Sequence, residues 1–187
     1  MCHVHVCVFA CQSHECFHVL CCLCLHFGRG TTEPINQAAP VAFKDAPYRV
    51  VHIAGARDYQ DLTAPGPHYV LLEYLTPFGI ALAAADAAVA RAGGSVFELA
   101  QYGLPAVLIP YPHASADHQT ANARWMAERG AALILKDAEL NPERLRAETD
   151  ELLARREEMA QAARRLARPD AARDIAEELL AAAARPA

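Results

Sequence analysis

Cysteine is absent from residue 25 to the end of this 187-residue chain. All seven cysteines lie in the first 24 residues, and five of the nine histidines lie in the first 26. A secreted domain held by disulfides spreads its cysteines through the fold that they join. The distribution therefore argues against an oxidised scaffold and predicts a cytoplasmic location.

The chain also lacks a strong positive charge and a long apolar run. Lysine occurs only at Lys44 and Lys136, and 17 basic against 22 acidic side chains give a formal net charge of −5. This balance attracts neither a nucleic-acid backbone nor an anionic membrane. No stretch of about eighteen apolar residues is free of polar side chains. We therefore expect no nucleic-acid partner and no membrane span.

Several sequence motifs that form catalytic or phosphate-binding sites in other proteins are missing. The sequence has no G-x-S-x-G nucleophile turn and no G-x-x-x-x-G-K-[ST] phosphate loop. His113 and His118 stand five residues apart with no third ligand in view, which argues against a metal site, although either histidine stays a candidate general base. We assign no catalytic residue, no metal ligand and no cofactor.

Residues 1–30 form a Cys/His-rich prefix that we expect to lie outside the fold. The prefix lacks the basic start and the cleavage site of a signal peptide, and it has no C-x-x-C pair with zinc-ligand spacing. A misplaced start or a frame-shifted flank accounts for such a segment. Metal binding through its cysteines and histidines is the alternative. Residues 31–187 are the expected domain.

From about Ile35 onward, short apolar runs alternate with amphipathic segments. Runs separated by helices of about ten residues are typical of a parallel sheet with helices on both faces. We predict one α/β, Rossmann-like domain. The expected strands are Tyr48–Ala54, His68–Leu75, Ala87–Gly93, Ala106–Pro110 and Ala131–Leu135, and the expected helices are Thr76–Ala85, Ser95–Tyr102, Gln119–Arg129 and a region of roughly forty residues that starts at Asn141 and Pro142 and is broken at Pro169.

Helix starts in this pattern carry typical capping residues. Thr76 precedes a proline that suits the first helical position. Ser95 and Glu98 have the S-x-x-E spacing of a capping box. Asp117 is placed to cap the helix that begins near Gln119. We expect these side chains to cap the three helix starts.

Three polar segments follow expected strands, and the carboxyl ends of parallel strands are where such sheets bind ligands. They are the end of His68–Leu75, the turn Arg91–Glu98 and the loop Tyr111–Ala123. A carboxylate at Glu98 either caps its own helix or accepts hydrogen bonds from two vicinal ribose hydroxyls. The amide of Gln119 suits a sugar hydroxyl pair, because it both donates and accepts.

The stretch Ala85–Leu135, with its G-L-P-A-x-L-I-P-Y-P-H and D-H-Q-T-x-N-A elements, resembles the C-terminal, donor-binding half of the MurG family. These are UDP-N-acetylglucosamine (UDP-GlcNAc) transferases of peptidoglycan synthesis, with two Rossmann-like domains in the GT-B arrangement. The resemblance extends more weakly from Ile35 to residue 180. It implies glycosyltransferase family 28 and, for intact members, peripheral action at the cytoplasmic face of the membrane.

The resemblance also implies residues that bind the donor. Leu75 lies against the uracil through its backbone, and Glu98 holds the ribose hydroxyls. Gln119 binds hydroxyls of the GlcNAc ring. The nucleotide is lined by Gly94, Ser95, Val96 and Phe97.

Two departures from the family pattern lower the expected activity. The N-terminal acceptor domain of the family has no counterpart before Gly28. The family segment G-G-S-x-G-A-R, which contacts the donor phosphates, aligns only with Phe27–Pro34, where its serine is missing and Pro34 offers no N–H donor. A diphosphate without this cradle binds weakly. We expect a truncated fragment that is inactive alone, binds UDP-GlcNAc weakly and takes a separate N-terminal domain as a partner.

A different class of function stays open. The charge pattern of residues 141–187, rich in Arg and Glu, allows a non-catalytic interaction module whose helices bind a partner, although such patterns more often mark a solvated face.

Overall fold

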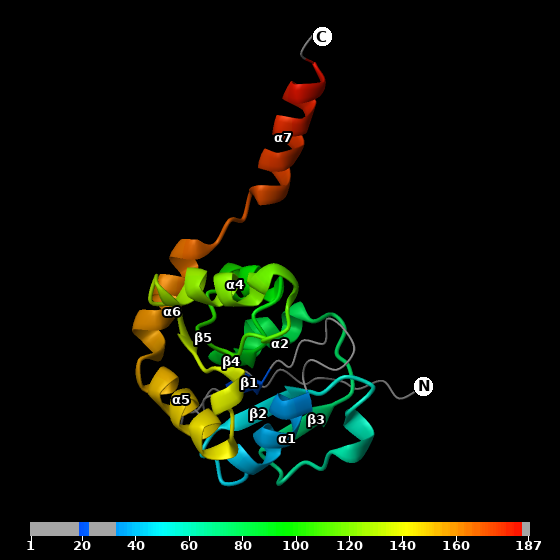
Figure 1. Ribbon diagram of the computed structural model, residues 1–187, viewed down its shortest axis with the longest axis vertical. Coiled ribbons are helices and arrows are strands. Elements are labelled where there is room, and N and C mark those ends of the chain that lie inside the picture. Colours follow the sequence, from blue (N-terminus) through cyan, green and yellow to red (C-terminus); the bar gives the residue numbers. More distant parts are fainter. Residues whose placement is uncertain (1–18, 23–32, 185–187) are drawn as a thin grey trace, which may run out of the picture.

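The computed structural model describes the backbone of residues 19–22 and all atoms of residues 33–184. Its sheet is parallel throughout, with the strand order β3-β2-β1-β4-β5-β6 (Figure 1). The prediction of an α/β, Rossmann-like domain is confirmed. The strands are β1 Val19–Cys22, β2 Arg49–Ile53, β3 Tyr69–Leu72, β4 Ala87–Ala90, β5 Ala106–Leu108 and β6 Ala132–Ile134.

Helices connect these strands and cover both faces of the sheet (Figure 1). The α-helices are α1 Glu33–Ala42, α2 Gly79–Ala84, α3 Ser95–Gln101, α4 His118–Ala127, α5 Pro142–Ala154, α6 Arg156–Leu166 and α7 Ala171–Ala183. Short 3₁₀ turns are η1 Tyr59–Asp61, η2 Ser115–Asp117 and η3 Asp137–Glu139.

Alternation along the strands divides the core between the two faces of the sheet. Val89 and Val107 point to a cluster that also contains Ile35 and Phe43 from α1 and its end, with Leu145 from α5. The neighbouring strand residues point the other way, into a cluster with side chains of α2, α3, α4 and α6; its members include Ala88, Ala90, Ala106, Leu108, Leu82, Leu99, Met126 and Ala163. All four residues of β4 are buried, as expected for a strand covered on both faces.

The central strand β1 comes from the Cys/His-rich prefix. Its backbone pairs in parallel with β2 on one side and with β4 on the other. These four residues therefore lie inside the sheet, whereas the sequence pattern predicts that all of residues 1–30 lie outside the fold. The run VLCC is unbroken and apolar, which suits a strand between two parallel neighbours. The rest of the prefix lies outside the described residues.

Several element boundaries differ from their predicted positions. The helix predicted to begin after Thr76 starts at Gly79, and Phe78 rather than Thr76 is its N-cap. That prediction is wrong, because Thr76 and Pro77 belong to the bend that leads out of β3. The C-terminal region divides at Arg155 as well as before Pro169, giving three helices. The helix start predicted at Asn141 and Pro142 is confirmed: Asn141 is the N-cap of α5, and its side chain accepts a hydrogen bond from the Arg144 N–H at 2.8 Å.

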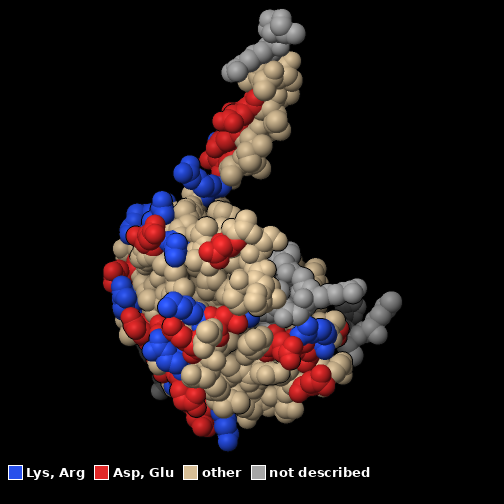
Figure 2. Space-filling model, in the orientation of Figure 1, with Lys and Arg blue, Asp and Glu red and all other residues tan. Residues whose placement is uncertain are grey.

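Helix α7 projects from the body and covers no part of the sheet (Figure 1). None of its residues is buried. Figure 2 shows acidic side chains along one side of α7 and uncharged side chains along the other. The apolar side exposes Ile175, Leu179 and Leu180.

Candidate functional site

The turn after β4 begins α3 without the predicted capping box. The N-cap is Gly94, which makes no side-chain cap bond. The Ser95 hydroxyl is buried and is the one buried side-chain polar atom in the described part of the chain without a hydrogen-bond partner. Glu98 is exposed, and its carboxylate makes no hydrogen bond or ion pair with the described residues. The capping prediction is wrong here, so the Glu98 carboxylate is available to a ligand.

Open space borders the backbone of the same turn. A Cβ atom added at Gly93 or at Gly94 would meet no other atom within 4 Å. Gly94 has a φ of −59°, so the turn does not need glycine for its conformation. Val96 is fully buried, whereas Phe97 exposes 58% of its surface. Of the predicted nucleotide-lining residues, Gly94 and Phe97 are therefore accessible, and the side chains of Ser95 and Val96 are not.

The loop after β5 reaches α4 through two consecutive residues in the left-handed region. Ala116 has a φ of 51° and Asp117 a φ of 53°. Asp117 occupies the N-cap position of α4 as predicted, but its side chain makes no cap hydrogen bond. This conformation costs an L-residue roughly 1–2 kcal/mol. The loop therefore depends on contacts at its base for its shape.

Gln119 supplies one of these contacts. It is 9% exposed, and its Oε1 accepts a hydrogen bond from the backbone N–H of Tyr111 at 3.0 Å. No hydrogen bond joins its Nε2 to the described residues, and Nε2 is not among the buried, unpartnered atoms. The Gln119 amide thus holds the loop with its oxygen and keeps its N–H₂ group at the surface.

Side chains of α4 join the two segments that follow β4 and β5. The Nδ2 group of Asn122 donates to the carbonyl of Ala92 at 2.9 Å and lies 3.4 Å from that of Gly93. The Trp125 ring lies 5.2 Å from the Phe97 ring, centroid to centroid. The structure therefore brings the turn that leads into α3 into direct contact with helix α4.

Leu75 follows β3 by three residues and is partly buried against the core cluster that contains Val96. Its backbone N–H and C=O make no hydrogen bond with the described residues. Both groups are thus unpaired within the described residues, and the backbone contact of Leu75 to a base stays a prediction. The segment Phe27–Pro34, expected at the phosphates, lies outside the described residues except for Glu33 and Pro34, which begin α1.

A buried polar network at the carboxyl end of β2 was not predicted. The Nδ2 group of Asn36 donates to Ala54 O at 2.9 Å and to Asp58 Oδ2 at 2.8 Å, so Asn36 Oδ1 is left as an acceptor. His52 Nε2 lies 2.9 Å from that oxygen and therefore carries the proton, and His52 Nδ1 accepts from the Tyr69 hydroxyl at 2.7 Å. The network orients the His52 ring and joins α1 to β2 and β3.

Arg57 closes this network at the surface. Its Nε contacts Asp58 Oδ1 at 2.6 Å and its Nη2 contacts Glu33 Oε2 at 3.0 Å. The hydrogen bond with Asp58 and the two nearby carboxylates raise the pKa of the Arg57 guanidinium. Arg57 therefore stays positively charged beside the start of α1.

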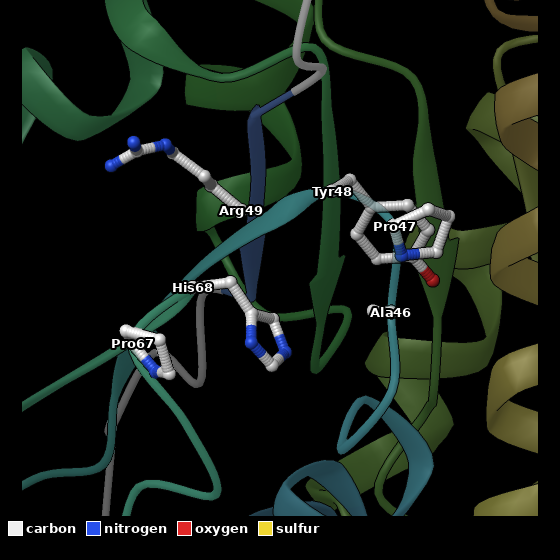
Figure 3. A pocket seen from close by; sticks show the side chains of 6 residues that line it. All are labelled: Ala46, Pro47, Tyr48, Arg49, Pro67 and His68. Atoms are coloured by element: carbon white, nitrogen blue, oxygen red, sulfur yellow. The ribbon is translucent and has the colours of Figure 1, made fainter.

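A pocket with a volume of about 520 Å³ is lined in part by Phe97, Glu98 and Trp125. A second pocket, of about 360 Å³, is shown in Figure 3. It is lined by Arg49 and His68, which stand at the amino ends of β2 and β3. This second pocket lies at the opposite edge of the sheet from the predicted site, so it is not the expected ligand site.

The sequence profile of the Glycosyltransferase family 28 C-terminal domain matches residues 30–179. The chain belongs to this family. A relative from Rubrobacter xylanophilus, the UDP-N-acetylglucosamine--N-acetylmuramyl-(pentapeptide) pyrophosphoryl-undecaprenol N-acetylglucosamine transferase, is 43% identical over 160 residues, which cover 83% of this chain and 48% of the relative. A protein of the same name from Salinibacter ruber is 47% identical over 143 residues, covering 73% of this chain and 38% of its own length.

Solved structures of glycosyltransferases share this family fold. The crystal structure of Acinetobacter baumannii MurG matches with a TM-score of 0.75 and 29% identity, over 89% of this chain and 52% of that one. The calicheamicin glycosyltransferase CalG4 matches with a TM-score of 0.68 and 26% identity, over 91% of this chain and 45% of that one. The family 28 domain described here spans about half the length of the relatives that it matches.

Two further properties concern only the described residues. No helix there is long and apolar enough to cross a membrane. No group of three or more His, Cys, Asp or Glu side chains gathers there as a metal ion would need. The alternative that cysteines and histidines of the prefix bind a metal concerns side chains that lie outside the described residues.

Proposed function

We propose that this chain binds UDP-GlcNAc as the donor half of a MurG-like N-acetylglucosaminyltransferase of peptidoglycan synthesis. The observation that carries the proposal is the Glu98 carboxylate, which is exposed at the start of α3 and makes no bond with the described residues. A free carboxylate at the carboxyl end of a parallel strand accepts hydrogen bonds from the two hydroxyls of a ribose.

The surroundings of Glu98 supply the other parts of a nucleotide-sugar site. The open backbone at Gly94 gives room for a flat group, and the unpaired N–H and C=O groups of Leu75 suit the edge of a uracil. The Nε2 group of Gln119 donates to a hydroxyl of the sugar ring. These residues follow β3, β4 and β5, so one ligand spans the carboxyl ends of three strands.

The names of the relatives support this substrate, since the Rubrobacter and Salinibacter proteins are both N-acetylglucosamine transferases. Because the chain spans about half of the Rubrobacter relative and of the MurG structure, the activity proposed for this chain is donor binding. A separate N-terminal acceptor domain is the proposed partner. Affinity is expected to be weak if the segment before α1 lacks the phosphate contacts of the family.

Calorimetry with UDP tests the ribose contact. Glu98→Ala should weaken UDP binding by roughly tenfold to a hundredfold, because each hydrogen bond to a charged acceptor contributes about 1.5–3 kcal/mol. Gln101→Ala is the matched control, since Gln101 is also exposed on α3 but lies one turn further from the end of β4. It should change the affinity less than about twofold. Equal affinities for the Glu98 variant and the wild type would show that the ribose assignment is wrong.

A further inference from the structure

Arg91, the first residue after β4, is buried although it is charged. It is 3% exposed, and its Nη1 donates to the carbonyl of Ile109 at 3.2 Å, with that of Pro110 at 3.5 Å. The same group forms an ion pair with Asp137 of η3. A buried charge is costly unless it is paired and hydrogen-bonded, and here the oxygens come from the ends of two other strands. Arg91 thus joins the carboxyl ends of β4, β5 and β6.

The contacts of Arg91 continue into the loop after β5. Its guanidinium carbon lies 5.6 Å from the centroid of the Tyr111 ring, within cation–π distance. The backbone N–H of Tyr111 is the group that donates to Gln119 Oε1. A continuous series of contacts therefore runs from Asp137 through Arg91 and Tyr111 to the Gln119 amide.

These contacts lie at the base of the loop between β5 and α4, which contains two residues in a strained conformation. Ala116 and Asp117 are both left-handed, and Asp117 makes no cap bond that would hold α4 to the loop. Such a conformation persists only when its surroundings hold it in place. The Arg91–Tyr111 contact and the bond from Tyr111 to Gln119 hold the two ends of the segment together.

We propose that Arg91 is a positioning residue that sets the direction of the Gln119 amide and thereby the preference of the site for a UDP-linked hexose over UDP. The inference rests on the proposed function. Arg91 is too buried to touch the donor, so it acts through Tyr111 and Gln119. Glu98 and Leu75 do not take part in this series, and the uridine contacts are independent of it.

Calorimetry with UDP and with UDP-GlcNAc on four proteins tests the proposal. The wild type is compared with Arg91→Met, Tyr111→Ala and Arg156→Met. The last is a matched control, because Arg156 also pairs with an aspartate, Asp86, at 2.9 Å, but at the amino end of β4. Arg91→Met and Tyr111→Ala should weaken UDP-GlcNAc binding about fivefold, the equivalent of one neutral hydrogen bond, and leave UDP binding within about twofold. The control should leave the ratio of the two affinities unchanged.

The outcomes distinguish a failure of this inference from a failure of the proposed function. If Arg91→Met and Tyr111→Ala leave the affinity ratio unchanged, or reduce both affinities equally, Arg91 is merely structural and the inference fails. If the wild type binds neither ligand, the proposed function fails and the inference with it. Should Arg91→Met not fold, Tyr111→Ala decides, because it leaves the buried ion pair of Arg91 and Asp137 intact.

Discussion

The spacing of Ser95 and Glu98 is compatible with a capping box and also with side chains that do not cap the helix. The S-x-x-E pattern predicts reciprocal capping, yet Ser95 turns inward without a partner and Glu98 faces outward. A buried hydroxyl without a hydrogen bond lowers stability and is uncommon unless the site uses it. We infer that this turn is arranged for a ligand at some cost in stability.

Replacement of Ser95 tests that arrangement. Ser95→Ala should leave the free energy of unfolding unchanged or raise it by up to about 1 kcal/mol, because the hydroxyl has no partner to lose. A working capping box would instead lose about 1 kcal/mol. Urea denaturation followed by circular dichroism measures the difference. A clear loss of stability would restore the capping interpretation.

Loss of the buried hydrogen bonds around His52 should lower the free energy of unfolding more than the loss of an exposed hydrogen bond. Asn36→Ala removes the partner of the Ala54 carbonyl and of His52 Nε2 in the buried region, so it should cost about 2–3 kcal/mol of unfolding free energy. Gln37→Ala is the control, because Gln37 is the next residue of α1 and makes only an exposed bond to Glu33. Its cost should stay below about 0.5 kcal/mol. Equal costs in urea denaturation would mean that the network adds nothing to stability.

At the scale of elements, two positions with the sequence pattern of a helix cap differ in whether the side chain caps a helix. Asn141 accepts from the Arg144 N–H and is followed by Pro142 at the first helical position. Thr76 has the same sequence signature but stands three residues before α2. Asn141 and Thr76 both precede a proline, but only Asn141 makes a cap hydrogen bond.

Two alanine variants test this difference. Asn141→Ala should lower the unfolding free energy by about 1 kcal/mol, because it removes a cap bond from α5. Thr76→Ala should change it by less than about 0.5 kcal/mol, because Thr76 is exposed and caps nothing. Thermal unfolding of the two variants side by side gives the comparison. A larger effect at Thr76 would contradict the observed start of α2.

At the scale of the whole molecule, helix α7 is separate from the packed body. Isolated helices of this length are marginal in water, and most helical stability in proteins comes from packing. The apolar side of α7 has no partner among the described residues.

Removal of the last segment should therefore leave the body intact. Deletion of residues 171–187 should change the free energy of unfolding by less than about 0.5 kcal/mol, since no side chain of α7 is buried. Calorimetry with UDP on the shortened chain should give the affinity of the full chain. A marked loss of either property would show that α7 packs on the body in solution.

The sequence predicted the strands and helices better than the side-chain contacts of the candidate site. The apolar runs at β2, β4, β5 and β6 match the observed strands within a few residues. The strand β1 was missed, because its cysteines and histidine neighbours resemble no family segment. Arg91 was also missed, since an arginine after a strand has no signal of burial in a single sequence.

The sequence by itself determined the alternation of strands and helices, the family and the polar residues at the strand ends, because all of these depend on local pattern. Only the tertiary structure decided which of those residues point outward, that Ser95 caps nothing, and that Arg91 holds the loop of Gln119. The physical reason is that burial and hydrogen-bond partners come from residues far apart in the chain. Asp137 lies 46 residues from Arg91, and no local spacing indicates that the two meet.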